Sequence, residues 1–142
     1  RQIRVIITTG SPRPAYLIDQ LHKRNKLAKV DFKTKFVDFA GYAEVLPTVA
    51  ECEHNNGMHL IPGITYTEVI NSKTMKHVKN NERGILIYTG FKYGSRFIRY
   101  IVGDEATFID EPCRCGRTTP RIKDIHRVMD IQRFEEGCGV WK

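Results

Sequence analysis

The sequence predicts an α/β fold in which a βαβ unit leads into an antiparallel β subdomain. Two observations carry this prediction. The first third of the chain runs strand, helix, strand, an order typical of a parallel sheet. After about residue 57 the chain becomes a series of short alternating runs separated by tight turns, which is typical of an antiparallel sheet or partial barrel. We therefore divide it into an α/β segment, residues 1–56, and a β-rich subdomain, residues 57–127.

Each element of the βαβ unit has its own signal. Residues 3–9 (IRVIITT) are apolar, rich in β-branched side chains and closed by a Gly/Pro turn, as expected of a buried strand. Residues 15–25 follow Pro14, a favourable residue at a helix start, and carry apolar side chains at helical spacing. Residues 33–40 (KTKFVDFA) complete the unit as the next strand.

The second half of the chain is predicted to form short strands joined by turns. Residues 57–71 alternate between apolar and polar, and residues 85–91 and 96–104 predict two further strands. Residues 106–110 are expected to pair with the preceding strand across a Gly-Asp-Glu turn. Alternation resumes over 121–134 and then loses its pattern.

The composition is that of a soluble globular protein. Hydrophobic residues make up 41% and charged residues 27% of 142, which excludes a disordered chain. No apolar run approaches the ~20 residues that span a bilayer, and no signal peptide is recognisable. We therefore expect a cytoplasmic protein with no membrane partner, in which cysteines serve metal binding, catalysis or packing before disulfides.

The chain is strongly basic, with a formal net charge of +7. Such a charge raises the question of nucleic acid as a partner. Residues 1–35 hold nine Lys or Arg against two acidic residues, at a spacing that fits one solvated helix face. Because basic and aromatic residues are not interleaved, as they are in single-strand binders, we do not expect nucleic acid as a partner. A nucleotide ligand would also suit this charge.

Two of the four cysteines, Cys113 and Cys115, flank a single residue in a Pro-Cys-x-Cys-Gly turn. Such a turn can direct two thiolates at one point, because the glycine lets the backbone bend. The pair is therefore half of a metal site, one end of a disulfide, or two half-buried thiols in a turn. A zinc site would need two further nitrogen or sulfur ligands.

The polar stretch that contains Cys52, His54 and His59 offers those ligands. Cys52 with either histidine would complete a Cys3His set, with the thiols ionised and the imidazole neutral. His59 is favoured over His54 because it begins a strand after Gly57 and could be held rigidly. Cys138 is the spare cysteine, expected as a free thiol, with replacement of Cys52 as its alternative role.

Six segments follow one another in an order that resembles a known pattern. They are 10–12 (GSP), 40–44 (AGYAE), 51–59 (ECEHNNGMH), 99–104 (RYIVGD), 113–118 (CRCGRT) and 126–130 (HRVMD). The chain thereby resembles the phenylacetate–coenzyme A ligase family of adenylate-forming enzymes. That family carries Gly-Glu-Pro, Tyr-Gly-x-Thr-Glu, Glu-Cys-Glu with Gly-x-His, Arg-Tyr-x-x-x-Asp, Cys-x-Cys-Gly-Arg-Thr and Gly-Arg-x-x-Asp. Each motif is short, but their common order is specific and covers nearly the whole chain.

The resemblance implies that the βαβ unit belongs to the nucleotide-binding subdomain of the large N-terminal domain of an adenylate-forming enzyme. Such enzymes attack the α-phosphorus of ATP with a carboxylate, giving an acyl-adenylate and pyrophosphate, and coenzyme A then takes the acyl group. The implied cofactors and partners are ATP/AMP, Mg²⁺, structural Zn²⁺, coenzyme A and a small carboxylic acid. The identity of the acid is not given, and the oligomeric state is left open, a homodimer included.

The resemblance also implies roles for individual residues. Asp104 matches the aspartate that holds the ribose hydroxyls, since two carboxylate oxygens suit a vicinal diol. Glu44 matches the acid that supports Mg²⁺ at the phosphates, and Arg127 matches the hinge arginine near ribose and phosphate. The turn around adenine and the glycine of Tyr-Gly correspond to Gly10, Ser11, Pro12 and Gly41.

The same resemblance assigns Cys52, His59, Cys113 and Cys115 to the zinc-binding positions of family members that carry the Cys-x-Cys-Gly-Arg segment. Four protein ligands fill a zinc tetrahedron and leave no position for water or substrate, so this zinc is expected to be structural.

Several positions depart from the family pattern. Ala40 stands where a tyrosine packs on the nucleotide, Ala43 where a threonine meets phosphate, Ser11 where a glutamate follows glycine, and His126 where a glycine precedes the hinge arginine. The family's phosphate loop and lysine-bearing lid have no counterpart here. We therefore expect an internal segment of a larger enzyme, in which residues 128–142 begin the hinge. The alternative is a divergent, non-catalytic, zinc-stabilised module for nucleotide binding or interaction.

Overall fold

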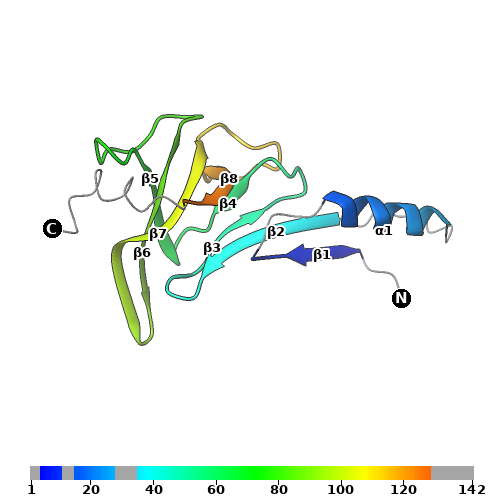
Figure 1. Cartoon of the computed structure of the whole chain (residues 1–142), viewed down its shortest axis with the longest axis horizontal. Coiled ribbons are helices and arrows are strands. Elements are labelled where there is room, and N and C mark those ends of the chain that lie inside the picture. Colours follow the sequence, from blue (N-terminus) through cyan, green and yellow to red (C-terminus); the bar gives the residue numbers. More distant parts are fainter. Residues whose placement is uncertain (1–3, 11–14, 28–34, 129–142) are drawn as a thin grey trace.

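The computed structural model describes residues 4–10, 15–27 and 35–128, in which eight strands form one sheet, accompanied by one helix (Figure 1). The elements are β1 (Val5–Thr8), α1 (Ala15–Leu27), β2 (Lys35–Tyr42), β3 (Leu46–Glu51), β4 (Met58–Leu60), β5 (Thr65–Ile70), β6 (Arg83–Lys92), β7 (Ser95–Ile109) and β8 (Arg121–Arg127). Across the sheet the strand order is β1-β2-β3-β4-β8-β7-β6-β5.

The predicted βαβ unit is present at the start of the described chain. β1 and β2 pair in parallel, with Val5 opposite Lys35 and Thr8 opposite Asp38, and α1 lies between them in sequence. Every other neighbouring pair of strands in the sheet is antiparallel. The predicted class, a βαβ unit followed by antiparallel β structure, is confirmed.

The predicted turn at Gly-Asp-Glu is wrong, because β7 runs through it without interruption from Ser95 to Ile109. The polar residues mimic a turn in the sequence, yet Asp104 and Glu105 are each only 7% exposed. They lie opposite Arg127 and His126 of β8, which supply polar partners inside the sheet. The glycine before them adopts a left-handed backbone, and this local irregularity is absorbed without ending the strand.

The strand β3 has no counterpart among the predicted elements. Pro47 in its second position weakens the strand signal, because proline cannot donate to a ladder. The structure places Pro47 opposite Gly41, next to a shift in the β2–β3 register, where the missing donor is tolerated. Thr48 and Val49 are fully buried, so tertiary packing decides this strand.

The sheet is strongly curled. β2 and β7 are four strand steps apart in the sheet order, which in a flat sheet corresponds to roughly 19 Å. The Tyr42 hydroxyl at the end of β2 nevertheless donates to the Asp104 carboxylate of β7 at 2.6 Å. A tyrosine side chain cannot bridge the flat distance, so the sheet bends into the partial barrel that the short strands predict.

The interior of this curl holds the main hydrophobic cluster. Its completely buried members come from β3, β5, β6, β7 and β8: Val49, Val69, Leu86, Tyr88, Ala106 and Ile122. Burial of one such large aliphatic side chain contributes about 1.5–3 kcal/mol, so the cluster fixes the curvature that brings distant strands together. No helix in the described ranges has the length and apolar character to cross a membrane.

Candidate functional site

A cavity of about 770 Å³ opens where β2, β4, β7 and β8 approach one another. Four of the residues implied by the ligase motifs line it: Gly10, Gly41, Asp104 and Arg127. They come from four separate parts of the chain, and the curl of the sheet brings them to one hollow. Ser11 and Pro12, the other two residues of the adenine turn, lie outside the described residues.

Asp104 is the centre of the polar contacts at this cavity. The Arg127 Nε atom lies 3.2 Å from its Oδ1 oxygen, and the Tyr42 hydroxyl donates to its Oδ2 oxygen at 2.6 Å. Asp104 and Arg127 are directly opposite in the β7–β8 register, which fixes their approach. A buried carboxylate with a guanidinium on one oxygen and a phenol on the other is held in one orientation.

The phenol of Tyr42 acts as a donor in this contact. Burial, followed by the neighbouring Tyr88 and Asp104, raises the pKa of Tyr42 far above its ordinary value. Burial likewise raises the pKa of Tyr88 to about 12. Tyr42 therefore stays protonated and donates its hydrogen to Asp104.

Gly103 makes room for Arg127. Its φ is +84°, and a Cβ atom placed there would lie 2.6 Å from the Arg127 Nη1 atom. The same guanidinium donates to the Val102 carbonyl oxygen. The glycine before Asp104 thus has two reasons to be glycine, its backbone conformation and the arginine beside it.

The Gly103→Ala variant should lower the free energy of unfolding by about 1–2 kcal/mol, because an alanine in the left-handed region is strained. If the cavity binds the nucleotide that the ligase motifs imply, the variant should also bind it severalfold more weakly, since the added methyl displaces the guanidinium. Urea denaturation and calorimetry of the full-length protein measure the two effects. Gly63→Ala is the matched control, because Gly63 has a φ of +85° and, its chain neighbours aside, no described residue comes within 4 Å of the position that an added methyl would take. Equal nucleotide affinity in both variants would contradict the role given to the arginine contact.

The cavity lining also contains two acidic residues that were not identified from the sequence. Asp38 and Glu51 both line it, and Asp38 is only 6% exposed. Thr8 donates its hydroxyl to Asp38 Oδ1 at 3.1 Å, while the Asp38 backbone N–H and the Asn55 amide donate to Glu51 Oε2 at 2.9 and 3.0 Å. Strand alternation places Asp38 on the same face of β2 as residues 40 and 42, which is the signal that could have revealed it.

Glu44 lies outside this cavity. It sits in the turn between β2 and β3, and the Tyr100 hydroxyl lies 3.5 Å from its Oε1 atom. The cavity lining does not include it. The residues that the structure describes therefore form no Mg²⁺ site around Glu44 in this arrangement, and its role in supporting Mg²⁺ stays a prediction.

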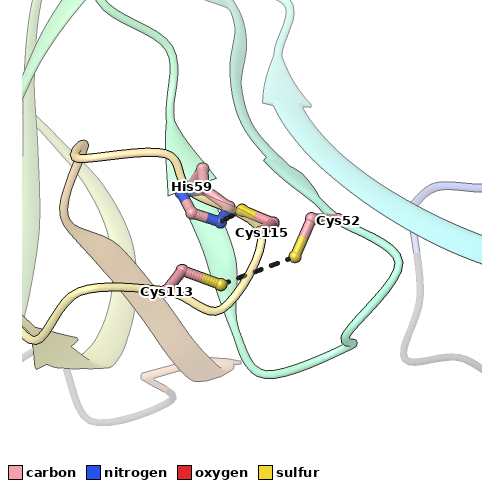
Figure 2. A group of neighbouring side chains, drawn as sticks. All are labelled: Cys52, His59, Cys113 and Cys115. Atoms are coloured by element: carbon pink, nitrogen blue, oxygen red, sulfur yellow. Dashed lines mark hydrogen bonds between the residues drawn. The ribbon is translucent and has the colours of Figure 1, made fainter.

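A second cluster brings together the four residues predicted to bind zinc (Figure 2). Cys52 follows β3, His59 lies in β4, and Cys113 and Cys115 lie in the loop between β7 and β8. Their ligand atoms all lie within 4.8 Å of one another. His54 is exposed and is not part of the cluster, whereas Cys138 lies outside the described residues.

The distances in this cluster fit a tetrahedral ion. Cys52 Sγ lies 3.7 Å from Cys113 Sγ, and Cys115 Sγ lies 3.4 Å from His59 Nε2. A regular zinc tetrahedron with Zn–S bonds near 2.3 Å has sulfur–sulfur edges of about 3.8 Å and slightly shorter sulfur–nitrogen edges. Two edges thus already have the required length, and the donor set of three sulfurs and one nitrogen is one that zinc prefers.

The surroundings of His59 leave the correct nitrogen free. Its Nδ1 atom lies 3.3 Å from the Thr119 carbonyl oxygen and 3.2 Å from the Thr119 hydroxyl. A proton on Nδ1 donates to the carbonyl, so Nε2 carries the lone pair that faces the cysteines. Burial lowers the pKa of His59, which favours the neutral form that a metal needs.

Arg121 carries a buried positive charge that the zinc-filled cluster would balance. It is only 2% exposed and lies opposite His59 in the β4–β8 register. Its guanidinium donates to the carbonyl oxygens of Asn56 and Glu111, and its buried Nε atom has no partner among the described residues. A buried cation needs an anionic neighbour. Zn²⁺ with three thiolates and one neutral histidine carries a net charge of −1, which matches one guanidinium.

The thiols themselves differ in their protonation. The backbone N–H of Cys115 lowers the pKa of Cys113, which favours its thiolate. Burial raises the pKa of Cys52, which favours its thiol, and either sulfur of the close pair can donate the proton that they share. Metal binding would replace that shared proton, as expected for a site that releases protons when it is filled.

Neither a protein-family model nor a curated protein sequence matches the chain. Solved structures do match. An open conformation of 2-hydroxyisobutyryl-CoA ligase in complex with 2-HIB-AMP and CoA superposes with a TM-score of 0.73 at 27% identity, covering 89% of this chain and 28% of that one. The chain thus spans about 28% of the length of this ligase.

Two more distant structures share the fold alone. FadD1 of Archaeoglobus fulgidus, a long-chain-fatty-acid-CoA ligase, gives a TM-score of 0.59 at 14% identity, with 91% of this chain and 29% of that chain covered. MatB of Rhodopseudomonas palustris gives 0.52 at 15% identity, with 84% and 25% covered. Two of these three structures are named as CoA ligases, one of them bound to 2-HIB-AMP and CoA, and the sheet has the fold of a part of the N-terminal domain of adenylate-forming enzymes.

Proposed function

We propose that this chain forms part of the nucleotide site of an AMP-forming acyl- or aryl-coenzyme A ligase. One observation carries the proposal: the Asp104–Arg127 pair faces the same cavity as Gly10 and Gly41. These residues were assigned to a nucleotide by motifs that lie far apart in the sequence, and a cavity of about 770 Å³ is large enough for a nucleotide.

The reaction proposed joins a carboxylate oxygen to the α-phosphorus of ATP and breaks the bond to pyrophosphate. In the second step the thiol of coenzyme A takes the acyl group and releases AMP. Asp104 accepts hydrogen bonds from the two ribose hydroxyls. Arg127 places a fixed positive charge beside the ribose and the phosphate. The Cys-x-Cys-Gly-Arg-Thr segment favours a ligase of the phenylacetate–coenzyme A type.

The departures from the family pattern are partly offset within this cavity. Ala40 removes an aromatic face, but Tyr42 lies two residues along the same face of β2 and also lines the hollow. Tyr42 thus supplies an aromatic side chain at the cavity in place of the one that Ala40 lacks.

Zinc in this proposal is structural. Cys52, His59, Cys113 and Cys115 would hold it and leave no open position for substrate. The ion would join the β7–β8 loop to β3 and β4. Because β8 carries Arg127, this connection supports the position of the hinge arginine without taking part in the chemistry.

Carboxylate-dependent ATP–pyrophosphate exchange by the full-length protein tests the proposal. Exchange of labelled pyrophosphate into ATP is expected with at least one member of a panel of aromatic and aliphatic acids, and none without acid. No exchange across the panel, together with no heat on titration with ATP·Mg²⁺, would favour the non-catalytic zinc-stabilised module. A zinc assay on the same sample shows that the protein tested is intact.

A further inference from the structure

Tyr42 contacts Asp104 across the curled sheet, and the ligase motifs assign it no role. Its hydroxyl donates to Asp104 Oδ2 at 2.6 Å, a length typical of hydrogen bonds to a charged oxygen. Its ring packs on Tyr88, with the ring centroids 5.2 Å apart and the planes tilted by 45°. Since Tyr88 is completely buried, the phenol is held by packing at one end and by the carboxylate at the other.

Within the described ranges Asp104 has two side-chain contacts, and these leave half of its acceptor capacity free. Tyr42 uses Oδ2 and Arg127 uses Oδ1. A carboxylate offers about four acceptor positions, two on each oxygen, so one position stays free on each oxygen. Asp104, Tyr42 and Arg127 all line the cavity. A vicinal diol has two hydroxyl donors close together. These donors match the two free acceptor positions of Asp104, one on each carboxylate oxygen.

The diol can donate to both oxygens only if the Asp104 carboxylate has the right orientation. The terminal torsion of an aspartate is broad, so an unrestrained carboxylate rotates and presents its oxygens in many directions. Arg127 restrains one oxygen from β8, and its side chain is 60% exposed. Tyr42 restrains the other oxygen from β2, through a ring packed against the core. The better-packed restraint is therefore the phenol.

We infer that Tyr42 is a positioning residue that fixes the Asp104 carboxylate so that one free acceptor position on each oxygen faces the ribose. The inference rests on the proposed function, because it needs a nucleotide in the cavity. Recognition of the two ribose hydroxyls then depends on Tyr42, which contacts the Asp104 carboxylate and does not contact the sugar.

Tyr42→Phe tests this inference, because it removes the hydroxyl and keeps the packed ring. Wild-type full-length protein and the variant are titrated calorimetrically with AMP, 2′-deoxy-AMP and 3′-deoxy-AMP. The wild type should prefer AMP over either deoxynucleotide by about tenfold, the worth of one hydrogen bond to a charged group. In the variant, AMP affinity should fall about fivefold to tenfold and deoxynucleotide affinity less than twofold, so the preference nearly disappears.

Two controls separate positioning from general damage. Tyr66→Phe removes the hydroxyl of a tyrosine that is 67% exposed, and it should leave all three affinities unchanged. In an Asp104→Asn background, Tyr42→Phe should not change the preference for AMP over the deoxynucleotides any further, because the charged carboxylate that Tyr42 positions is gone. A merely structural role of Tyr42 would lower all three affinities by the same factor.

The outcomes also separate this inference from the proposed function. If the wild type prefers AMP and Tyr42→Phe keeps the same preference, the inference is overturned and the proposed function stands. Tighter AMP binding by the variant would mean that the phenol competes with the ribose, which overturns the inference as well. If zinc-loaded wild type binds none of the three nucleotides, the proposed function fails, and the inference fails with it.

Discussion

Replacing both Cys113 and Cys115 by serine should abolish zinc binding and lower the free energy of unfolding by at least about 3 kcal/mol. The two thiolates are half of the ligand set, and serine hydroxyls do not replace them. The loss is large because Arg121, only 2% exposed, then has no anionic cluster to balance its charge. Metal analysis of protein purified without added metal, followed by urea denaturation, measures both effects.

The matched control for this pair is Cys138→Ser, which removes the spare thiol, outside the described residues. It should keep about one zinc per chain, the content expected of the wild type. A strong chelator should reproduce the destabilisation in the wild type and have no effect on the double variant. Unchanged zinc content after loss of both thiols would show that the metal is bound elsewhere.

Asp104→Ala should reduce kcat/KM for ATP by about 100- to 1,000-fold in the full-length protein. Two hydrogen bonds from ribose hydroxyls to a charged acceptor are lost, and each is worth about 1.5–2 kcal/mol. Arg127 and Tyr42 also lose the group that orients them at the cavity. The rate of carboxylate-dependent ATP–pyrophosphate exchange, measured over a range of ATP concentrations, gives the ratio.

Two companion variants make this result specific. Asp104→Asn keeps the shape of the side chain and one acceptor oxygen. Its kcat/KM for ATP should therefore lie between the values of the wild type and of the alanine variant. Asp110→Ala changes an exposed aspartate beyond the end of β7 and should retain wild-type exchange. Full exchange activity in Asp104→Ala would remove Asp104 from the nucleotide site.

Local patterns predicted the elements that are determined by neighbouring residues. The β-branched run before a Gly/Pro turn became β1, and the helical spacing after Pro14 became α1. The predicted burial of β1 is wrong, since Val5 is 50% and Ile7 is 66% exposed. The choice of His59 over His54 followed from a strand start after Gly57, and β4 does begin at Met58. Such features depend on a few adjacent side chains, so a sequence pattern is enough to find them.

Features that depend on distant partners were missed or mistaken. The polar run Gly-Asp-Glu looks like a turn, and only the pairing of β7 with β8 shows that its carboxylates are buried in a strand. β3 has a proline and a weak pattern, and packing between β2 and β4 creates it. Glu44 was assigned by motif position; it lies in the turn after β2 and is not in the cavity lining, and its role in supporting Mg²⁺ stays a prediction.

The sequence by itself predicted a βαβ unit followed by antiparallel strands, and it indicated which residues could bind zinc and which carboxylate could accept hydrogen bonds from a diol. Only the tertiary structure decided which of these residues meet. Tyr42 and Asp104 are separated by 62 positions and four strand steps, yet their oxygens lie 2.6 Å apart. The reason is the curl of the sheet, which results from the packing of a buried core shared by five strands and is encoded in no single segment.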